Sequence, residues 1–241
     1  MPERVERVAA LVRAQSGADL VVLPELWPQG AFTYRSWEPT AEPLDGQIVT
    51  ALGTAARDVG AHVHMGSFVE RDGDRLFNTS VVLDPGGHIV ATYRKIHRFG
   101  FAAGEPTLLT AGPKPVVWSS PWGGVGLATC YDLRFPELFR ALLDDGAEVV
   151  VVTSGWPQAR IGHWALLARA RAVENQVVLV GCNAVGQQGS TLLGGRSLVV
   201  DPWGEVLAEA GADEEQLTVD ADPAQVARVR AEFPVLADRR L

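Results

Sequence analysis

The chain has 241 residues and a mass of 25.8 kDa, which fits one domain or two small halves that share a core. Hydrophobic residues make up 47% and charged residues 21%, a composition that excludes a disordered chain. The formal net charge of −8 argues against nucleic acid or an anionic membrane surface as the main partner.

The cysteine content and the N-terminal residues indicate a reducing compartment. Cys130 and Cys182 are too few for a disulfide-dense secreted scaffold. The first residues are charged and show no signal peptide, and no apolar stretch approaches the roughly 18 to 20 residues of a membrane span. We therefore predict a single domain over residues 1–241, located in the cytoplasm, without a nucleic-acid or membrane partner.

The first half of the chain alternates helical and strand patterns. Apolar residues at helical spacing predict a helix over residues 4–15 that ends at Gly17, and a Val-rich run over 19–23 predicts a buried strand. Asp45 is the predicted N-cap of a helix over 47–59. A Gly/Pro-rich loop is predicted over 97–114, after three strands over 61–69, 76–83 and 88–93.

The second half predicts the same kinds of element. Helices are expected over 136–144, where Pro136 takes the first position, over 162–173, and after Asp222-Pro223. The predicted strands cover residues 115–119, 124–129, 147–153, 176–184, 196–200 and 205–210.

Two short segments recur in the two halves. Residues 17–23 resemble 146–152, at an offset of 129, and residues 81–87 resemble 198–204, at an offset of 117. Each half therefore predicts one α/β layer, with two sheets packed together and helices outside.

The repeat also exposes a gap. The strand at 125–129 precedes the first helix of the second half, and the first half has no counterpart because the chain starts inside that helix. We expect the first sheet to lack a strand, either because the start is misassigned or because preceding residues are left out. Such a sheet has an unpaired edge or pairs there with another subunit.

Cys130 is the candidate nucleophile. It follows the small-residue strand at 125–129 and precedes the helix that begins at Pro136, so it lies on a strand-to-helix turn near N–H groups that can lower the pKa of a thiol. An inert buried thiol is the alternative. Cys182 lies within a Val-rich strand, where that alternative is favoured.

Three other charged residues follow strands or lie in loops. Glu25 comes after the strand at 19–23, at the end where α/β sheets place active sites. Lys95 follows the strand that ends at Arg94, and Glu105 lies in the long loop after it. Each residue alone is typical of a solvated surface charge.

Together these residues resemble a known family. Leu23-Pro24-Glu25-Leu26, Tyr93 to His97, and Cys130 to Glu137 are similar to the motifs of the nitrilase superfamily of carbon–nitrogen hydrolases. The segment from His163 to Gln176 and the turn from Asp201 to Glu205 add to the resemblance, which covers nearly the whole chain.

The resemblance implies a four-layer αββα sandwich, with a first strand that this chain lacks. It also implies a Glu25-Lys95-Cys130 catalytic triad, with a second glutamate that we place at Glu105, and often a homodimer. No cofactor or metal is required.

In the resulting hypothesis, Glu25 removes the Cys130 thiol proton and the thiolate attacks an amide carbon. Lys95 and the backbone N–H of Tyr131 stabilise the oxyanion. Ammonia leaves, and water then hydrolyses the thioester.

The substrate prediction is a small omega-amide of a dicarboxylic acid. Residues 156–160, before His163-Trp164, resemble the omega-amidase branch of the family. Tyr131 and Trp156 are predicted to line the pocket, and Arg160 is a candidate for binding the distal carboxylate. For Arg134, a structural ion pair with Glu137 is favoured.

The sequence leaves four alternatives open. Three are other activities of the superfamily: a deaminated-glutathione amidase, an N-carbamoyl amino-acid hydrolase and a nitrilase. The fourth is a non-catalytic dimeric binding module.

Overall fold

A computed structural model describes residues 1–101 and 103–240. Its first sheet has four strands in the order β1-β2-β3-β4, with β1 and β2 parallel and the other pairs antiparallel. The strands are β1 (Leu20–Val22), β2 (His62–Asp72), β3 (Arg75–Leu83) and β4 (Ile89–Arg94).

The second sheet has six strands in the order β12-β11-β8-β7-β6-β5, and β9 and β10 form a separate hairpin. Its core is the parallel set β6, β7 and β8. The strands are β5 (Val117–Ser120), β6 (Gly123–Thr129), β7 (Ala147–Ser154), β8 (Val178–Asn183), β9 (Val185–Gln188), β10 (Thr191–Gly194), β11 (Leu198–Val200) and β12 (Val206–Glu209).

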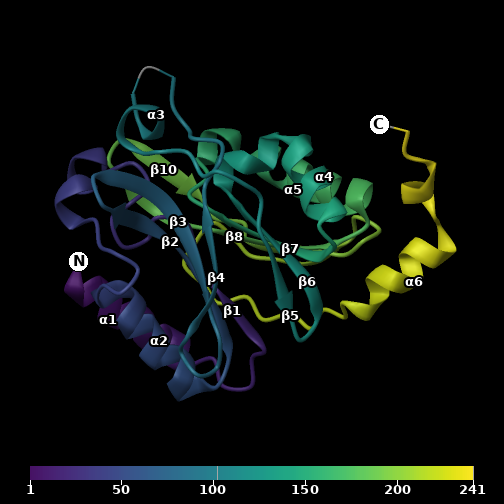
Figure 1. The fold of residues 1–241 in the computed structure, drawn as a ribbon, viewed down its shortest axis with the longest axis horizontal. Helices are drawn as coiled ribbons and strands as arrows, with labels where there is room; N and C mark the ends of the chain where they lie inside the picture. Colours follow the sequence, from purple (N-terminus) through teal and green to yellow (C-terminus); the bar gives the residue numbers. More distant parts are fainter. Residues whose placement is uncertain (102, 241) are drawn as a thin grey trace.

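Helices cover the outer face of each sheet (Figure 1). The α-helices are α1 (Pro2–Arg13), α2 (Gln47–Val59), α3 (Glu105–Leu108), α4 (Pro136–Asp144), α5 (Ile161–Asn175) and α6 (Ala224–Glu232). Short 3-10 helices are η1 (Tyr34–Ser36), η2 (Glu38–Thr40), η3 (Cys130–Arg134), η4 (Gln158–Arg160) and η5 (Val235–Asp238).

Three apolar clusters define the four layers. One lies between α1, α2 and the first sheet and includes Ile48 and Met65. A second lies between α4, α5 and the second sheet and includes Trp164. The third joins the two sheets and includes Val82 and Val151. The predicted αββα sandwich is therefore confirmed, and burial of apolar area in three seams is its main stabilising contribution.

The sheet topology reproduces the internal repeat. The pairings β1–β2, β2–β3 and β3–β4 have the same directions as β7–β8, β8–β11 and β11–β12. However, β7 also pairs with β6, whereas no described strand pairs with β1 on that side. The gap predicted in the first sheet is therefore an open edge at β1. All three residues of β1 are only partly buried, because that edge lacks a neighbour.

Several local predictions were wrong for identifiable reasons. The first helix ends at Arg13 rather than at Gly17. Asp45 does not cap α2, because Gly46 takes the N-cap position and the Glu42 carboxylate accepts a hydrogen bond from the backbone N–H of Ile48 at 2.8 Å. The predicted loop at 97–114 contains α3, and the hairpin β9–β10 was not predicted because its four-residue strands show no clear alternation.

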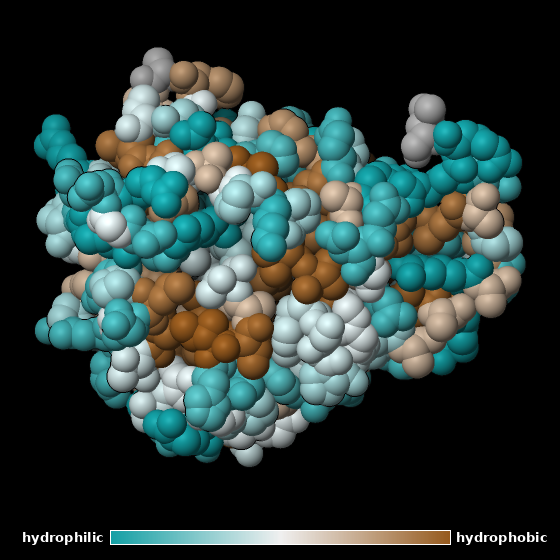
Figure 2. Space-filling model, viewed as in Figure 1, coloured by the Kyte–Doolittle hydropathy of each residue, from teal (hydrophilic) through white to brown (hydrophobic). Residues whose placement is uncertain are grey.

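Polar residues dominate the face of the molecule shown in Figure 2, and apolar residues gather there in a few separate patches. Within residues 1–101 and 103–240, no helix is both long enough and apolar enough to cross a bilayer.

His64 on β2 makes stability depend on pH. The ring is buried, its Nδ1 accepts a hydrogen bond from the Gly66 N–H at 3.3 Å, and its Nε2 has no partner among the described residues. Burial lowers the pKa of His64 from 6.5 to about 4. The unfolded chain therefore takes up a proton below pH 6.5 that the folded chain does not, and folding stability falls by about 3 kcal/mol as the pH drops from 6.5 to 4.

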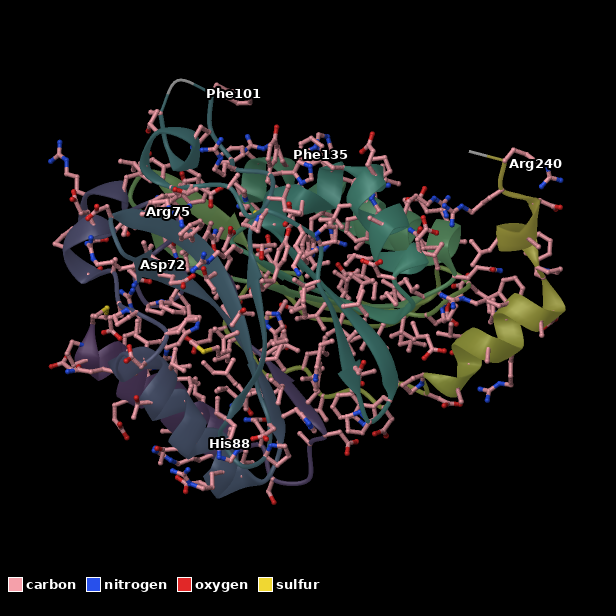
Figure 3. All side chains as sticks on the ribbon, viewed as in Figure 1. Asp72, Arg75, His88, Phe101, Phe135 and Arg240 are labelled. Atoms are coloured by element: carbon pink, nitrogen blue, oxygen red, sulfur yellow. The ribbon has the colours of Figure 1, made fainter. Side chains whose placement is uncertain are left out.

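We expect His64→Phe to flatten this part of the stability profile, as measured by urea unfolding at pH 7, 6 and 5. The exposed His88 lies in the turn between β3 and β4 (Figure 3), and His88→Gln serves as the control that keeps the wild-type slope. Equal slopes for His64→Phe and the wild type would contradict this role of His64.

Candidate active site

The predicted site residues meet in one pocket at the end of the sheets that carries α3, opposite the turn that contains His88 (Figures 1 and 3). Five backbone segments bring them together: the loop after β1, the end of β4, the start of α3, the turn after β6, and the segment that follows β7 through η4. The pocket has a volume of about 420 Å³, including its open mouth. Its wall contains all seven predicted residues, namely Glu25, Lys95, Glu105, Cys130, Tyr131, Trp156 and Arg160.

An ammonium lies between two buried carboxylates. Lys95 Nζ is 2.7 Å from Glu25 Oε1 and 2.9 Å from Glu105 Oε2. All three side chains are at most 5% exposed. The second oxygen of Glu25, Oε2, accepts a hydrogen bond from the Gly155 N–H at 2.9 Å. A carboxylate oxygen can accept more than one hydrogen bond, so Oε2 retains capacity toward a further donor.

Cys130 starts the turn η3 directly after β6. Its φ is +47°, in the left-handed region that residues other than glycine rarely adopt, so the backbone is strained at the thiol. A capping box holds this conformation: the Thr129 side chain accepts from the Asp132 N–H, and the Asp132 carboxylate accepts from the Thr129 N–H. The strained turn directs the Cys130 side chain into the pocket beside Glu25 and Lys95.

Asp132 also joins the Cys130 turn to the segment around Lys95, at the end of β4. Its Oδ2 accepts from the Tyr93 hydroxyl at 2.7 Å, and its Oδ1 lies 2.7 Å from His97 Nδ1. Tyr93 and His97 flank Lys95 in sequence. Burial and the Asp132 charge hold the pKa of Tyr93 well above its usual value, so the phenol remains a donor. The carboxylate therefore fixes the Lys95 segment relative to the Cys130 turn.

Burial dominates the titration of the site. It raises the pKa of the Cys130 thiol, the Glu25 charge adds to this effect, and Lys95 opposes it. The N–H groups of the turn were expected to lower this pKa, but removal from water outweighs them. Burial also raises the pKa of Glu105, against the opposing charge of Lys95. For Lys95, burial lowers the pKa, but Glu105 and Glu25 outweigh it and the pKa is raised well above 10.5. The site therefore holds a neutral thiol beside a charged lysine.

The pocket wall combines aromatic rings with two arginines. Tyr131 packs edge-on against Phe99 at a centroid distance of 5.3 Å, and Trp156 is 2% exposed. The Arg160 guanidinium lies 5.7 Å from the centroid of the Phe99 ring.

The predicted pairing of Arg134 with Glu137 was wrong. Arg134 lines the pocket instead, with its guanidinium 4.6 Å from the Trp156 ring centroid. Within residues 1–101 and 103–240, neither Arg134 nor Arg160 forms an ion pair with an acidic side chain. A cation stacked on an aromatic face in a pocket can bind an anionic group of a ligand.

The sequence interpretation missed Asn78 on β3. Its side-chain Nδ2 donates to Glu25 Oε1 at 2.8 Å and to Glu105 Oε1 at 2.7 Å. The available signal was a buried amide in a strand otherwise rich in Val, Leu and hydroxyl residues.

Comparison with known proteins identifies the family of the chain. The family described as carbon–nitrogen hydrolase matches residues 2–231 of the chain. The 2-oxoglutaramate amidase of Paenarthrobacter nicotinovorans is 44% identical, over 100% of this chain and 84% of that protein. The 2-oxoglutaramate amidase of Bacillus subtilis is 34% identical over 99% of this chain and 92% of its own length, and the human omega-amidase NIT2 is 34% identical over 99% and 90%.

Solved structures of carbon–nitrogen hydrolases have the same fold. A CN-hydrolase superfamily protein from Xanthomonas campestris, with an arsenic adduct in its active site, superposes with a TM-score of 0.90 and 31% identity, covering 100% of this chain and 92% of that one. A glutamate-to-glutamine variant of an amidase from Nesterenkonia sp. AN1, with an acetamide moiety added covalently to its active-site cysteine, gives a TM-score of 0.85 at 27% identity, covering 98% and 90%.

Proposed function

The chain belongs to the carbon–nitrogen hydrolase family, and on that premise we propose that it hydrolyses 2-oxoglutaramate, or a similar omega-amide of a small dicarboxylic acid, to the acid and ammonia. The observation that carries the proposal is the convergence of a thiol, two carboxylates and an ammonium in a pocket whose wall also holds two arginines without acidic partners among the described residues. The amidase names of the most similar curated relatives support the same substrate class.

In the first half of the proposed reaction, Glu25 takes the Cys130 proton as general base, and the sulfur attacks the amide carbon. The raised pKa of the thiol makes such a base necessary near neutral pH. Lys95 and the Tyr131 N–H stabilise the negative charge on the carbonyl oxygen. Glu25 returns the proton to the amide nitrogen, the C–N bond breaks, and ammonia leaves a thioester on Cys130.

In the second half, water replaces ammonia beside Glu25. Glu25 removes a proton from the water, with Glu105 positioning it, and the hydroxide attacks the thioester carbon. The C–S bond breaks, the sulfur recovers the proton from Glu25, and the acid is released. The hydrogen bond between Lys95 and Glu105 keeps Glu105 within reach of the same cavity.

A panel of substrates tests the reaction class. We expect ammonia release from 2-oxoglutaramate and succinamate to exceed that from simple nitriles and from N-carbamoyl amino acids. Carbon dioxide released together with ammonia would indicate a carbamoylase instead, and conversion of a nitrile but not of the amide would indicate a nitrilase. No turnover of any amide would contradict the proposed function.

We assign the distal carboxylate of the substrate to Arg160. Arg160→Met is expected to raise the KM for 2-oxoglutaramate by about 10- to 100-fold with little change in kcat, because a hydrogen bond to a charged group contributes about 1.5–3 kcal/mol. Turnover of butyramide, which lacks that carboxylate, should not change. Arg228→Met on α6 provides the control, since Arg228 pairs with Asp222 at an exposed site. An equal loss with both substrates would remove Arg160 from this role.

We also propose a homodimer that forms through α5. Leu166 and Val173 lie seven residues apart on one face of this helix and are 67% and 45% exposed, which is unusual for apolar side chains of their size. Light scattering should give twice 25.8 kDa, about 52 kDa. A monomer mass for the wild type would contradict the proposal.

The described thiols Cys130 and Cys182 are both free, which supports a reducing cytoplasm as the setting for a thiol nucleophile. Cell fractionation that places the protein elsewhere would contradict this assignment.

A further inference from the structure

Asn78 lies between the two glutamates of the site and is itself 2% exposed. It belongs to β3, and its backbone carbonyl accepts a hydrogen bond from the Lys95 N–H at 2.9 Å. This backbone hydrogen bond therefore fixes residue 78 directly beside residue 95. Its amide nitrogen bridges Oε1 of Glu25 and Oε1 of Glu105, at 2.8 and 2.7 Å.

The two carboxylates fix the orientation of this amide. Only the NH₂ end of an asparagine can face two acceptors, because the oxygen end would face them without a hydrogen to donate. The Oδ1 of Asn78 is consequently buried and has no partner among the described residues. A buried acceptor without a partner costs free energy, so the two hydrogen bonds to the glutamates have to outweigh that cost.

Lys95 and Asn78 act on the same pair of acids. Each donates to Oε1 of Glu25 and to Oε1 of Glu105, so these two oxygens are both occupied. The carboxylate of Glu25 cannot rotate without breaking two hydrogen bonds. Its Oε2 accepts one backbone hydrogen bond, from the Gly155 N–H at 2.9 Å, and the carboxylate lies within hydrogen-bond reach of the Cys130 thiol.

We propose that Asn78 is a positioning residue for proton transfer: its amide clamps both glutamates so that Oε2 of Glu25 faces Cys130 and Glu105 stays ionised beside Lys95. The inference rests on the proposed function, because it assigns Glu25 as the base for Cys130.

A pH-dependent readout distinguishes this role from simple support of the fold. Donation of an N–H to a carboxylate favours its charged form. Burial already raises the pKa of Glu105, Lys95 opposes this effect, and the Glu25 charge adds to it. The other titratable groups that face the pair are Cys130 on η3 and Tyr34 on η1. Loss of Asn78 therefore favours proton uptake by the two acids, and activity should be lost at a higher pH on the acidic side.

Asn78→Asp is the sharpest variant. It replaces the donor by a third carboxylate at nearly the same place, so one acid of the three must hold a proton at neutral pH. We expect the acidic limb of kcat/KM for ammonia release to move up by about one pH unit or more, and kcat to fall about 10- to 100-fold. The KM should change by less than about threefold, because Asn78 does not line the substrate pocket. Asn78→Ala should shift the limb in the same direction by a smaller amount.

Asn175→Ala is the matched control. Asn175 is also a buried asparagine whose Nδ2 donates one hydrogen bond and whose Oδ1 has no described partner, but it lies at the end of α5. Its removal should leave the pH profile of the folded protein unchanged. Thermal unfolding of each variant reports whether it folds, and if Asn78→Asp does not fold, the comparison between Asn78→Ala and Asn175→Ala decides.

Iodoacetamide labelling of Cys130, followed by peptide mass spectrometry across pH, separates this inference from the proposed function. If the wild type released no ammonia from any amide, the proposed function would fail, yet a shift of the labelling profile in the Asn78 variants would still support the clamp. If the acidic limb and the labelling profile stayed in place in Asn78→Asp, or in Asn78→Ala where Asn78→Asp does not fold, Asn78 would have only a structural role. An equal shift in Asn175→Ala would also overturn the inference.

Discussion

Replacement of Cys130 by alanine should reduce ammonia release by about 10⁵-fold or more, because the variant has no atom that can form the proposed thioester. The fold should survive. The polar neighbours of the thiol are Glu25, Lys95 and Ser154, and alanine keeps the Cβ in the same strained turn. We expect the free energy of unfolding to change by about 1 kcal/mol, as measured by urea denaturation.

Cys182 provides the matched control for this variant. It is the other cysteine of the chain, and it points into the seam between the sheets, where its Sγ lies 3.4 Å from the Val22 carbonyl oxygen. Burial raises the pKa of Cys182 to about 12, and no carboxylate among the described residues acts on this thiol as Glu25 acts on Cys130, so no neighbouring base is placed to take its proton. Cys182→Ala should keep wild-type turnover per folded molecule. Turnover by Cys130→Ala at the wild-type rate would remove the thioester from the mechanism.

The positions of the main site residues follow from strand ends. Glu25, Lys95 and Cys130 each come directly after a strand or its short extension, and a sheet sandwich gathers such ends on one side. The strand ends indicated that these side chains could lie near one another, and the resemblance to the carbon–nitrogen hydrolases predicted which of them form the site. The sandwich itself was predictable because two segments of the first half recur in the second with the same strand directions.

The partners of Asn78 and Arg134 were harder to predict from the sequence. Asn78 lies in the middle of a strand, where an amide is usually a satisfied core residue, and its partners are 53 and 27 residues away. Arg134 was expected to pair with Glu137 because the two are three residues apart on a helix, but α4 begins only at Pro136. Helical spacing therefore does not apply to Arg134, whose guanidinium stacks on Trp156 instead.

The state of the thiol was also not predictable from local sequence. A strand-to-helix turn exposes N–H groups, yet the pKa of Cys130 is raised because burial and the Glu25 carboxylate act on the same sulfur. A thiol that stays protonated near neutral pH reacts slowly with alkylating agents and oxidants, and its reactivity depends on a neighbouring base that takes the proton. In the proposed mechanism the Glu25 carboxylate is that base, and Lys95 and Asn78 both donate hydrogen bonds to it.

Replacement of Lys95 by methionine should impair both chemistry and stability. The ammonium is 1% exposed and is the only lysine or arginine paired with Glu25 or Glu105 in the described part of the chain. Without it, the oxyanion loses a donor, which costs about 10²- to 10³-fold in rate, and two carboxylates remain buried without a counterion. Breaking a buried ion pair by removing one partner costs about 3–5 kcal/mol.

The stability loss should depend on pH in a definite direction. In Lys95→Met, the two buried carboxylates repel each other, so the pair holds a proton in the folded state at a pH where the unfolded chain has lost it. Burial and the Glu25 charge already raise the pKa of Glu105, and removal of Lys95 removes the charge that opposes them. The unfolded carboxyl groups release their protons near pH 4.5, so the variant loses stability as the pH rises above that value. Its free energy of unfolding should therefore be higher at pH 5 than at pH 7.

Lys114→Met is the matched control for Lys95→Met. Lys114 is the only other lysine of the chain and is exposed, so Lys114→Met should match the wild type in turnover and in its stability profile. Urea unfolding at pH 5, 6 and 7 measures the stability difference, and stopped-flow detection of acylation measures the chemistry per folded molecule. A normal acylation rate in Lys95→Met would exclude Lys95 from oxyanion stabilisation, whereas a stability loss that does not change with pH would show that the two carboxylates are not coupled through it.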